Sequence, residues 1–233
     1  MCAVDRHRKD DPQPGAHLHS EQVHDLHHHD HPTPTTPPAT SHDDNDGHAN
    51  INRAHLSALG ILAINLYATP GAGTTTLLTE TTKQLSGKTS ITILEGDQQA
   101  PHNAQSIGRA LDDREPPTNS ILFIESPPGA ANTSRDLGKK YNIAILPATP
   151  GSNTLLQEAP KNFPTLDLII LTKIDLTPQQ NPDTQHAIDN LHDAKPNLQV
   201  LKLSATTSQG MSPWLQWLTK AHTQIPRAVA SKH

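Results

Sequence analysis

The stretch Tyr67-Ala68-Thr69-Pro70-Gly71-Ala72-Gly73-Thr74-Thr75-Thr76 stands between an apolar run and a helical pattern. A glycine-rich turn that enters a helix points backbone N–H groups at phosphate oxygens, and the helix dipole adds to the attraction. Gly71 and Gly73 meet that need. In the complete phosphate-loop motif a lysine and then a serine or threonine follow the last glycine. Here Thr74 occupies the lysine position.

The rest of this loop keeps part of the motif. Thr75 retains the hydroxyl that binds Mg²⁺, and Ala68 stands where the motif begins with glycine. The residues expected to hold the phosphates are Gly71, Ala72, Gly73, Thr74, Thr75 and Thr76. The alternative is a tight strand-to-helix turn that binds no ligand.

Strand and helix patterns alternate along the chain. Apolar runs predict strands at Ile61–Tyr67, Ser90–Leu94, Ser120–Ile124, Asn142–Leu146, Leu166–Leu171 and Leu198–Leu203. Helical patterns cover Asn52–Leu59, Thr75–Leu85, about Asn103–Leu111, Asn153–Ala159, Asp183–Leu191 and Met211–Ala221. The alternation predicts an α/β fold with a doubly wound, mostly parallel sheet of P-loop GTPase type, which binds its ligand at the carboxyl ends of the strands.

Composition limits the class of protein. A chain of 233 residues accommodates one α/β domain and a tail. The net charge of -5 argues against nucleic acid as a partner. The single cysteine, Cys2, indicates a reducing compartment, and no apolar run is long enough for a signal peptide or a membrane span. A cytoplasmic protein that does not enter a membrane is expected.

Residues 1–49 differ in amino-acid composition from the rest of the chain. They hold the histidines His7, His17, His19, His24, His27, His28, His29, His31, His42 and His48, together with many aspartates. Such a segment buries too little apolar surface to offset its conformational entropy, so a tail that is disordered without metal is expected. The predicted organisation is a metal-binding tail at 1–49, a folded domain at 50–225 and a C-terminal tail at 226–233.

The histidine-rich tail is a candidate metal site. His24, His27, His28, His29 and His31 offer several imidazole nitrogens to one ion, and neutral imidazole binds Ni²⁺, Zn²⁺ and Cu²⁺ without selecting nickel. Affinity should fall as pH drops through about 6.5, because the ligands must be deprotonated. The alternative is a solvated linker whose histidines bind nothing.

Two further positions are weaker metal candidates. Cys2, with the amino terminus exposed after methionine removal, could form a small additional site, or it is a simple unpaired thiol. His102 lies a few residues beyond the Glu95–Gln99 segment.

Two more segments point to a guanine nucleotide, and two carboxylates point to Mg²⁺. Leu171–Asp175 resembles the guanine-specificity motif, in which the aspartate, Asp175, accepts from the base and the stem of the lysine, Lys173, covers its face. Ser204-Ala205-Thr206 resembles the loop that donates a backbone N–H to the base. Asp97 and Glu125, each at a strand end, are candidate Mg²⁺ ligands or loop carboxylates without a ligand.

These residues together resemble the hydrogenase nickel-incorporation GTPases called HypB, from about Ala49 to His222. The strings that carry the resemblance are Asn52-Arg53-Ala54, Asn65-Leu66, Pro70–Gly73, Glu95-Gly96-Asp97-Gln98-Gln99, Ile121–Glu125, Asp136-Leu137-Gly138, Thr172-Lys173-Ile174-Asp175, Ser204-Ala205-Thr206, Gly210-Met211 and Trp214-Leu215. The resemblance implies GTP-dependent handling of nickel for nickel–iron hydrogenase. It also implies GTP/GDP, Mg²⁺ and Ni²⁺, with Zn²⁺ as a further candidate ion.

The family resemblance also implies partners. They are hydrogenase maturation accessory proteins and the hydrogenase large subunit, and a homodimer is a candidate assembly. Many family members carry a histidine-rich N-terminal stretch thought to store nickel, which this tail resembles. Urease accessory GTPases are a related alternative that the Glu95–Gln99 string disfavours.

The chain departs from the family pattern at its chemical centre. Thr74 replaces the lysine, the Cys-His pair after the Gln-Gln segment is missing, and the region 126–134 holds Asn132 or a neighbour in place of a second cysteine. Loss of one preorganised donor commonly costs about 3–4 kcal/mol of transition-state stabilisation. We therefore expect nucleotide binding through backbone amides and Mg²⁺ with very slow hydrolysis, which leaves the assignment as an enzyme open.

Two hypotheses about the missing phosphate-loop lysine remain. Lys139, Lys140 or a residue of a second subunit could supply the missing charge. Alternatively, the chain is a non-enzymatic nickel store that retains the GTPase fold as a scaffold.

Overall fold

The computed structural model describes residues 42–95, 103–126, 136–149, 152–162, 165–176 and 182–228. Cys2 and the candidate ligands His24, His27, His28, His29 and His31 lie outside the described residues, as do Asp97 and His102.

The described elements follow the predicted alternation of strands and helices. In chain order they are α1 (His42–Ala58), β1 (Leu62–Ala68), α2 (Thr74–Leu85), β2 (Ile91–Glu95), α3 (Ala104–Arg114), β3 (Ile121–Ser126), β4 (Tyr141–Pro147), α4 (Ser152–Asn162), β5 (Leu168–Thr172), the 3-10 helix η2 (Ile174–Leu176), α5 (Pro182–Ala194), β6 (Gln199–Lys202) and α6 (Met211–Thr223). Every predicted strand and helix is present, with ends shifted by a few residues.

The helix α1 is the exception, because it begins ten residues before the predicted start at Asn52. Asp, Asn and Gly dominate its first turns, and these residues have poor helix propensity. Tertiary hydrogen bonds oppose that tendency. Asn45 Nδ2 donates to the Asp136 carbonyl at 2.9 Å, and the Ala104 N–H donates to Asn45 Oδ1 at 3.0 Å. Propensity alone therefore misses the first part of this helix.

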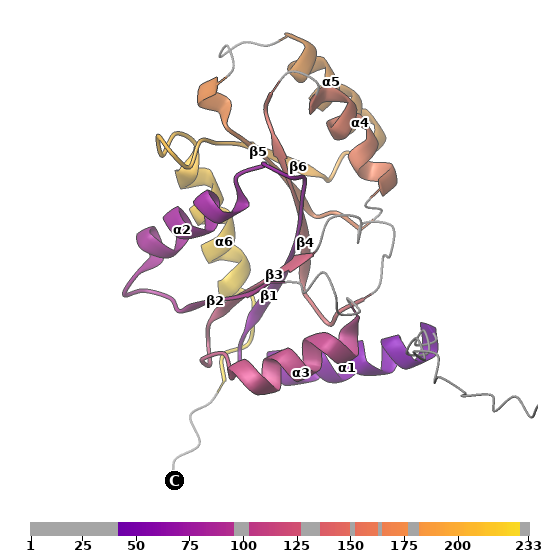
Figure 1. Ribbon diagram of the computed structural model, residues 1–233, viewed down its shortest axis with the longest axis vertical. Coiled ribbons are helices and arrows are strands. Elements are labelled where there is room, and N and C mark those ends of the chain that lie inside the picture. Colours follow the sequence, from indigo (N-terminus) through magenta and orange to yellow (C-terminus); the bar gives the residue numbers. More distant parts are fainter. Residues whose placement is uncertain are drawn as a thin grey trace, which may run out of the picture. The chain divides into compact units, whose positions relative to one another are not determined.

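The six strands form one sheet in the order β2-β3-β1-β4-β5-β6, and every neighbouring pair is parallel (Figure 1). Leu62 pairs with Ile121 on one side of β1, and Ile64 pairs with Tyr141 on the other. Parallel strands need crossover helices that cover both faces of the sheet, which explains the almost continuous apolar runs. The predicted α/β fold with an open parallel sheet is confirmed.

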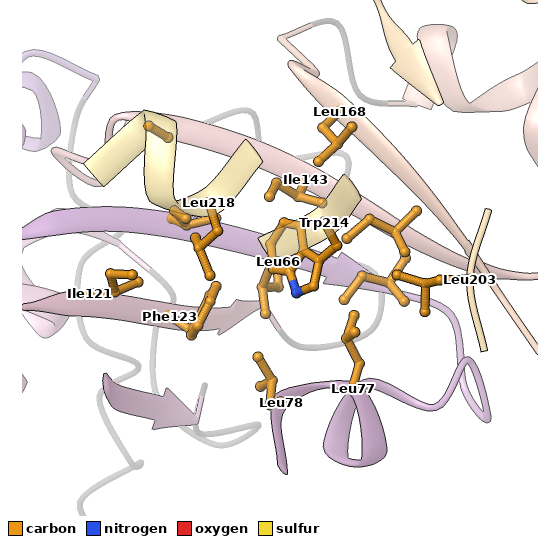
Figure 2. Packing of buried hydrophobic residues seen from close by; sticks show 14 of the residues in the cluster. Leu66, Leu77, Leu78, Ile121, Phe123, Ile143, Leu168, Leu203, Trp214 and Leu218 are labelled. Carbon is orange, nitrogen blue, oxygen red and sulfur yellow. The ribbon is translucent and has the colours of Figure 1, made fainter. Parts of the chain in front are cut away.

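One face of the sheet packs against α2 and α6. Trp214 of α6 is fully buried in this layer, with Phe123 of β3 and Leu77 of α2 in the same cluster (Figure 2). The Trp214 indole N–H donates to the Thr81 hydroxyl at 2.9 Å. This bond satisfies the one polar group that the indole brings into the core.

The opposite face is covered by two helix pairs. The pairs are α1 with α3 and α4 with α5 (Figure 1). Leu56 of α1 and Ile107 of α3 pack on β1, β2 and β3, whereas Leu156 of α4 and Ile188 of α5 pack on β4 and β5. The sheet is thus buried on both faces. Among the described residues no helix is both long and apolar enough to cross a membrane.

A close backbone approach and the side-chain hydrogen bonds of Asn52 hold α1 against the segment before β4. Gly138 has φ +85°, and a Cβ there would lie 2.6 Å from the Ala49 carbonyl oxygen. Asn52 Nδ2 donates to the Leu137 carbonyl at 3.1 Å and to the Ala104 carbonyl at 2.7 Å. Glycine is therefore required at position 138 both by its left-handed backbone and by the close approach of α1.

Replacement of Thr81 by valine should destabilise the domain by about 1–3 kcal/mol, because it leaves the buried Trp214 N–H without its acceptor. Chemical denaturation followed by tryptophan fluorescence measures the change. The matched control is Thr82→Val on the exposed face of the same helix, which should change the free energy of unfolding much less. Equal effects of the two substitutions would contradict this role of the hydrogen bond.

Candidate functional site

The carboxyl ends of all six strands meet at one edge of the sheet, because the strands are parallel. The glycine-rich segment follows β1, Glu95 ends β2, and Glu125 is the next-to-last residue of β3. Thr172 ends β5, and the Ser204 segment follows β6. The predicted site residues that the structure describes therefore come from four different strand ends at this edge and from the helix α2 beside it.

The glycine-rich loop has the backbone that a phosphate loop needs. Gly71 and Gly73 have φ values of +74° and +84°, and the Ala72 N–H donates to the Thr69 carbonyl at 3.0 Å. Gly73 is the N-cap residue of α2 and supplies no side-chain cap. The first N–H groups of a helix lack intrahelical partners, so those of Thr74 to Thr76 are available to an anion.

The turn after β5 lies directly against this loop. Thr172 Oγ1 is 2.5 Å from the Ala72 carbonyl oxygen and 3.2 Å from that of Leu146. Lys173 adopts φ +60°, and its Cε lies 3.6 Å from the position that a Cβ of Gly73 would take. The lysine stem therefore crosses over the glycine-rich loop.

The loop after β6 joins the same group. The Ile174 N–H lies 3.4 Å from the Leu203 carbonyl oxygen. Ser204 is buried, its N–H donates to the Gln209 carbonyl at 2.8 Å, and its hydroxyl accepts from the Thr207 N–H at 3.2 Å. Asp175 is exposed and Ala205 is half-buried. The three segments predicted to bind phosphate and guanine thus converge at one edge.

Two carboxylates lie next to each other at this edge. Glu95 and Glu125 are paired in the β2–β3 register. Each lies two residues after a strand residue, Ile93 or Phe123, whose side chain belongs to the core layer on the α2 side of the sheet. Burial raises the pKa of the Glu125 carboxyl, and the negative charge of Glu95 raises it further. Glu125 is therefore held in a desolvated position where a cation would be favoured.

Sequence reasoning missed two contributors to the site. Glu95 was visible only as part of a resemblance string, although its place at a strand end is the signal that Glu125 shares. The sequence marks Thr172 only as part of the string Thr172-Lys173-Ile174-Asp175. The contact of its hydroxyl with the glycine-rich loop is visible only in the tertiary structure.

The prediction that Lys139 or Lys140 of the same chain replaces the positive charge of the phosphate-loop lysine is wrong. The Lys140 N–H donates to the Ala63 carbonyl at 2.9 Å, at the amino end of β1. From Ala63 to Ala68 the strand rises about 16 Å, which is farther than a lysine side chain reaches. Both lysines lie at the edge of the sheet opposite the glycine-rich loop.

Metal ligands are not gathered in the described part of the chain. Within it, no group of three or more His, Cys, Asp or Glu side chains is placed to hold an ion. The predicted tail ligands and His102 fall outside those residues, so their roles remain predictions.

The fold and the loops at its carboxyl edge define the class: this is an α/β domain of the P-loop GTPase type. Two solved structures share the fold. HypB from Archaeoglobus fulgidus superposes with a TM-score of 0.63 at 22% identity over 76% of this chain and 98% of that chain. HypB from Helicobacter pylori, solved in complex with nickel, gives 0.60 at 18% identity over 81% and 99%.

Sequence relatives identify the family. The hydrogenase maturation factor HypB of Rhizobium leguminosarum bv. viciae is 34% identical over 212 residues, which cover 81% of this chain and 70% of the relative. The HypB of Escherichia coli K12 is 35% identical over 200 residues, which cover 76% and 69%. The chain belongs to the HypB family. No protein-family model matches it.

Substitution of Glu95 by glutamine should lower the pKa of Glu125 without restoring its usual value, because burial is the larger cause of the shift. A carboxyl whose pKa is raised on folding stabilises the fold less as pH rises through that pKa. Carbon-13 NMR titration of the Glu125 side chain measures the shift. Glu158→Gln on the exposed face of α4 is the control and should leave the pKa unchanged. An unchanged Glu125 pKa in Glu95→Gln would contradict the coupling.

Proposed function

We propose that this chain is a nickel-binding and GTP-binding accessory protein for nickel insertion during the maturation of nickel–iron hydrogenase, and that it hydrolyses GTP slowly. The observation that carries the proposal is the convergence of the glycine-rich loop with the Thr172–Asp175 turn and the Ser204 loop. Membership of the HypB family supports the biological role.

The nucleotide would lie along the carboxyl edge. Its phosphates would accept from the N–H groups of Gly73 and the first turn of α2. Its base would lie over the Lys173 stem with Asp175 as acceptor, and the Ala205 N–H would face the carbonyl of guanine. The exposed position of Asp175 leaves its carboxylate accessible to a base.

The side chains of Thr75 and Glu125 carry oxygen atoms of the kind that bind Mg²⁺. The Thr75 side chain is exposed at the start of α2, and its hydroxyl is the ligand type that a phosphate-bound Mg²⁺ uses. Glu125 would hold the ion directly or through water, and a nearby dication would lower its raised pKa. Asp97 remains a predicted third contributor.

Nickel is the cargo and would bind to the tail. Its imidazoles suit Ni²⁺ and equally Zn²⁺, so selectivity must come from supply. The receiving proteins would be maturation accessory proteins and the hydrogenase large subunit, and a homodimer is part of the proposal.

Slow hydrolysis follows from Thr74. Its side chain is neutral and short, so it supplies no charge to the transferring phosphate. The alternative is a non-enzymatic nickel store in which the GTPase fold serves as a scaffold, and the same substitution favours it.

Calorimetric titration of the full chain with a non-hydrolysable GTP analogue and Mg²⁺ separates the two functions. Saturable binding is expected, with a preference for guanine over adenine that Asp175→Asn removes. Nickel binding without nucleotide binding would favour the store and overturn the GTP-binding proposal.

Nickel titration tests the tail. Replacement of His24, His27, His28, His29 and His31 by asparagine in the full chain should remove most Ni²⁺ binding above pH 7. The matched control replaces the exposed domain residues His55, His186 and His192 by asparagine and should leave binding unchanged. Equal losses in both variants would contradict a tail site.

Thr74→Lys should raise the GTP turnover number by about 100- to 1,000-fold, because it returns a preorganised cation to the transferring phosphate. Thr79→Lys, on the exposed face of the same helix, adds the same charge outside the loop and should have no such effect. Steady-state phosphate release measures both. Wild-type turnover equal to that of Thr74→Lys would overturn the proposal of impaired hydrolysis.

A further inference from the structure

A pocket lies at the amino edge of the sheet, away from the glycine-rich loop. Its volume is about 420 Å³, and it is enclosed by α1, the start of β1, the segment before β4 and the segment after α6. Pockets of this size bind small molecules. None of the nucleotide-site residues lines it.

Positive side chains gather at this pocket. Arg53, Lys139 and Lys140 line it. The carboxylates that face them are Asp136, which pairs with Arg53 and lies 4.0 Å from Lys139 Nζ, and Asp167, which interacts with both lysines. Within this group of side chains, three cations thus lie near two carboxylates.

Each of these carboxylates is also engaged by the backbone. Asp136 Oδ1 accepts from the Gly138 N–H at 2.9 Å, and Asp167 Oδ2 accepts from the Asn142 N–H at 2.8 Å. Their charge is therefore partly committed to the loops they hold. Less of it is available to balance the cations.

Lys139 is the buried member of the cationic group. Only 7% of its side chain is exposed. Burial lowers the pKa of its ammonium group, although the charge of Asp136 opposes that effect. A desolvated ammonium gains more from an added anion than an exposed one does, because screening by water is weak there.

The rest of the lining is mainly apolar, and Ser57 and Gln224 are its uncharged polar members. Leu56, Ile61 and Ala63 are almost fully buried, and Ile225 and Pro226 also line the pocket. A ligand that fits must therefore combine one negative charge with an apolar body. A polyanion such as a nucleotide would find too few cations and too much apolar surface.

We propose that this pocket binds a small aliphatic monocarboxylate, with its carboxylate on Lys139 and its chain against Leu56 and Ile61. The inference goes beyond the proposed function and does not depend on it, because the two sites lie at opposite edges of the sheet.

The test uses hexanoate as the probe and two-dimensional NMR of the ¹⁵N-labelled full chain. Saturable shifts are expected at the amides of Ser57, Ala63 and Gly138, with no matching change at Gly71 and Gly73. Hexan-1-ol, which has the same chain without the charge, should bind at least about tenfold more weakly. Equal binding of the two compounds, or shifts spread over the whole domain, would overturn the proposal.

Two variants locate the ligand. Lys139→Met keeps the length of the side chain and removes its charge, and it should weaken hexanoate binding about tenfold. Ser57→Trp, at an exposed position of α1, should fill the pocket mouth and abolish binding while all charges remain. Lys161→Met, at an exposed position of α4, is the control and should not change the affinity.

The outcomes are decisive even if one variant fails to fold. Unchanged hexanoate affinity in folded Lys139→Met or in Ser57→Trp would show that the pocket is not the site. Binding of the GTP analogue by Ser57→Trp is measured in parallel, so a failure of the nucleotide proposal is distinguished from a failure of this one.

Discussion

Parallel pairing of β1 with β3 on one side and β4 on the other is the constraint on which the rest of the structure depends. After β1 the chain forms β2 and β3 on one side of β1, and it then forms β4, β5 and β6 on the other side. The direction in which successive strands are added therefore reverses at β1. Crevices in doubly wound sheets open at such a point, outside the carboxyl ends of the strands. The glycine-rich loop follows β1 and therefore lies where the crevice opens.

Contacts between loops then hold the glycine-rich loop and the turn after β5 together. The Thr172 hydroxyl contacts the Ala72 carbonyl, and the Lys173 stem packs over Gly73. Thr172 is the last residue of β5 and Ala72 lies two residues before α2, so the sheet and α2 hold the two loops. The distance between a bound phosphate and a bound base would thus be set before any ligand arrives, which lowers the ordering cost of binding.

The two edges of the sheet differ in charge. The carboxyl edge carries the Glu95–Glu125 pair beside backbone N–H groups, an arrangement suited to a cation together with phosphate. The amino edge carries Lys139 and its basic neighbours around apolar walls. A sheet buried on both faces leaves the two ends of its strands as the places where polar side chains can gather.

The sequence by itself determined the element order and the parallel sheet, because runs such as Ile61–Tyr67 are apolar on both faces and alternate with helical patterns. It also predicted the glycine-rich turn, since Gly71 and Gly73 mark a backbone that other residues adopt with difficulty. Only the tertiary structure decided the start of α1, which hydrogen bonds of Asn45 extend against local propensity. It also placed Lys139 and Lys140 at the wrong edge to replace the missing charge and Glu95 beside Glu125. Those outcomes depend on strand register and on contacts between residues far apart in the chain, which no local pattern encodes.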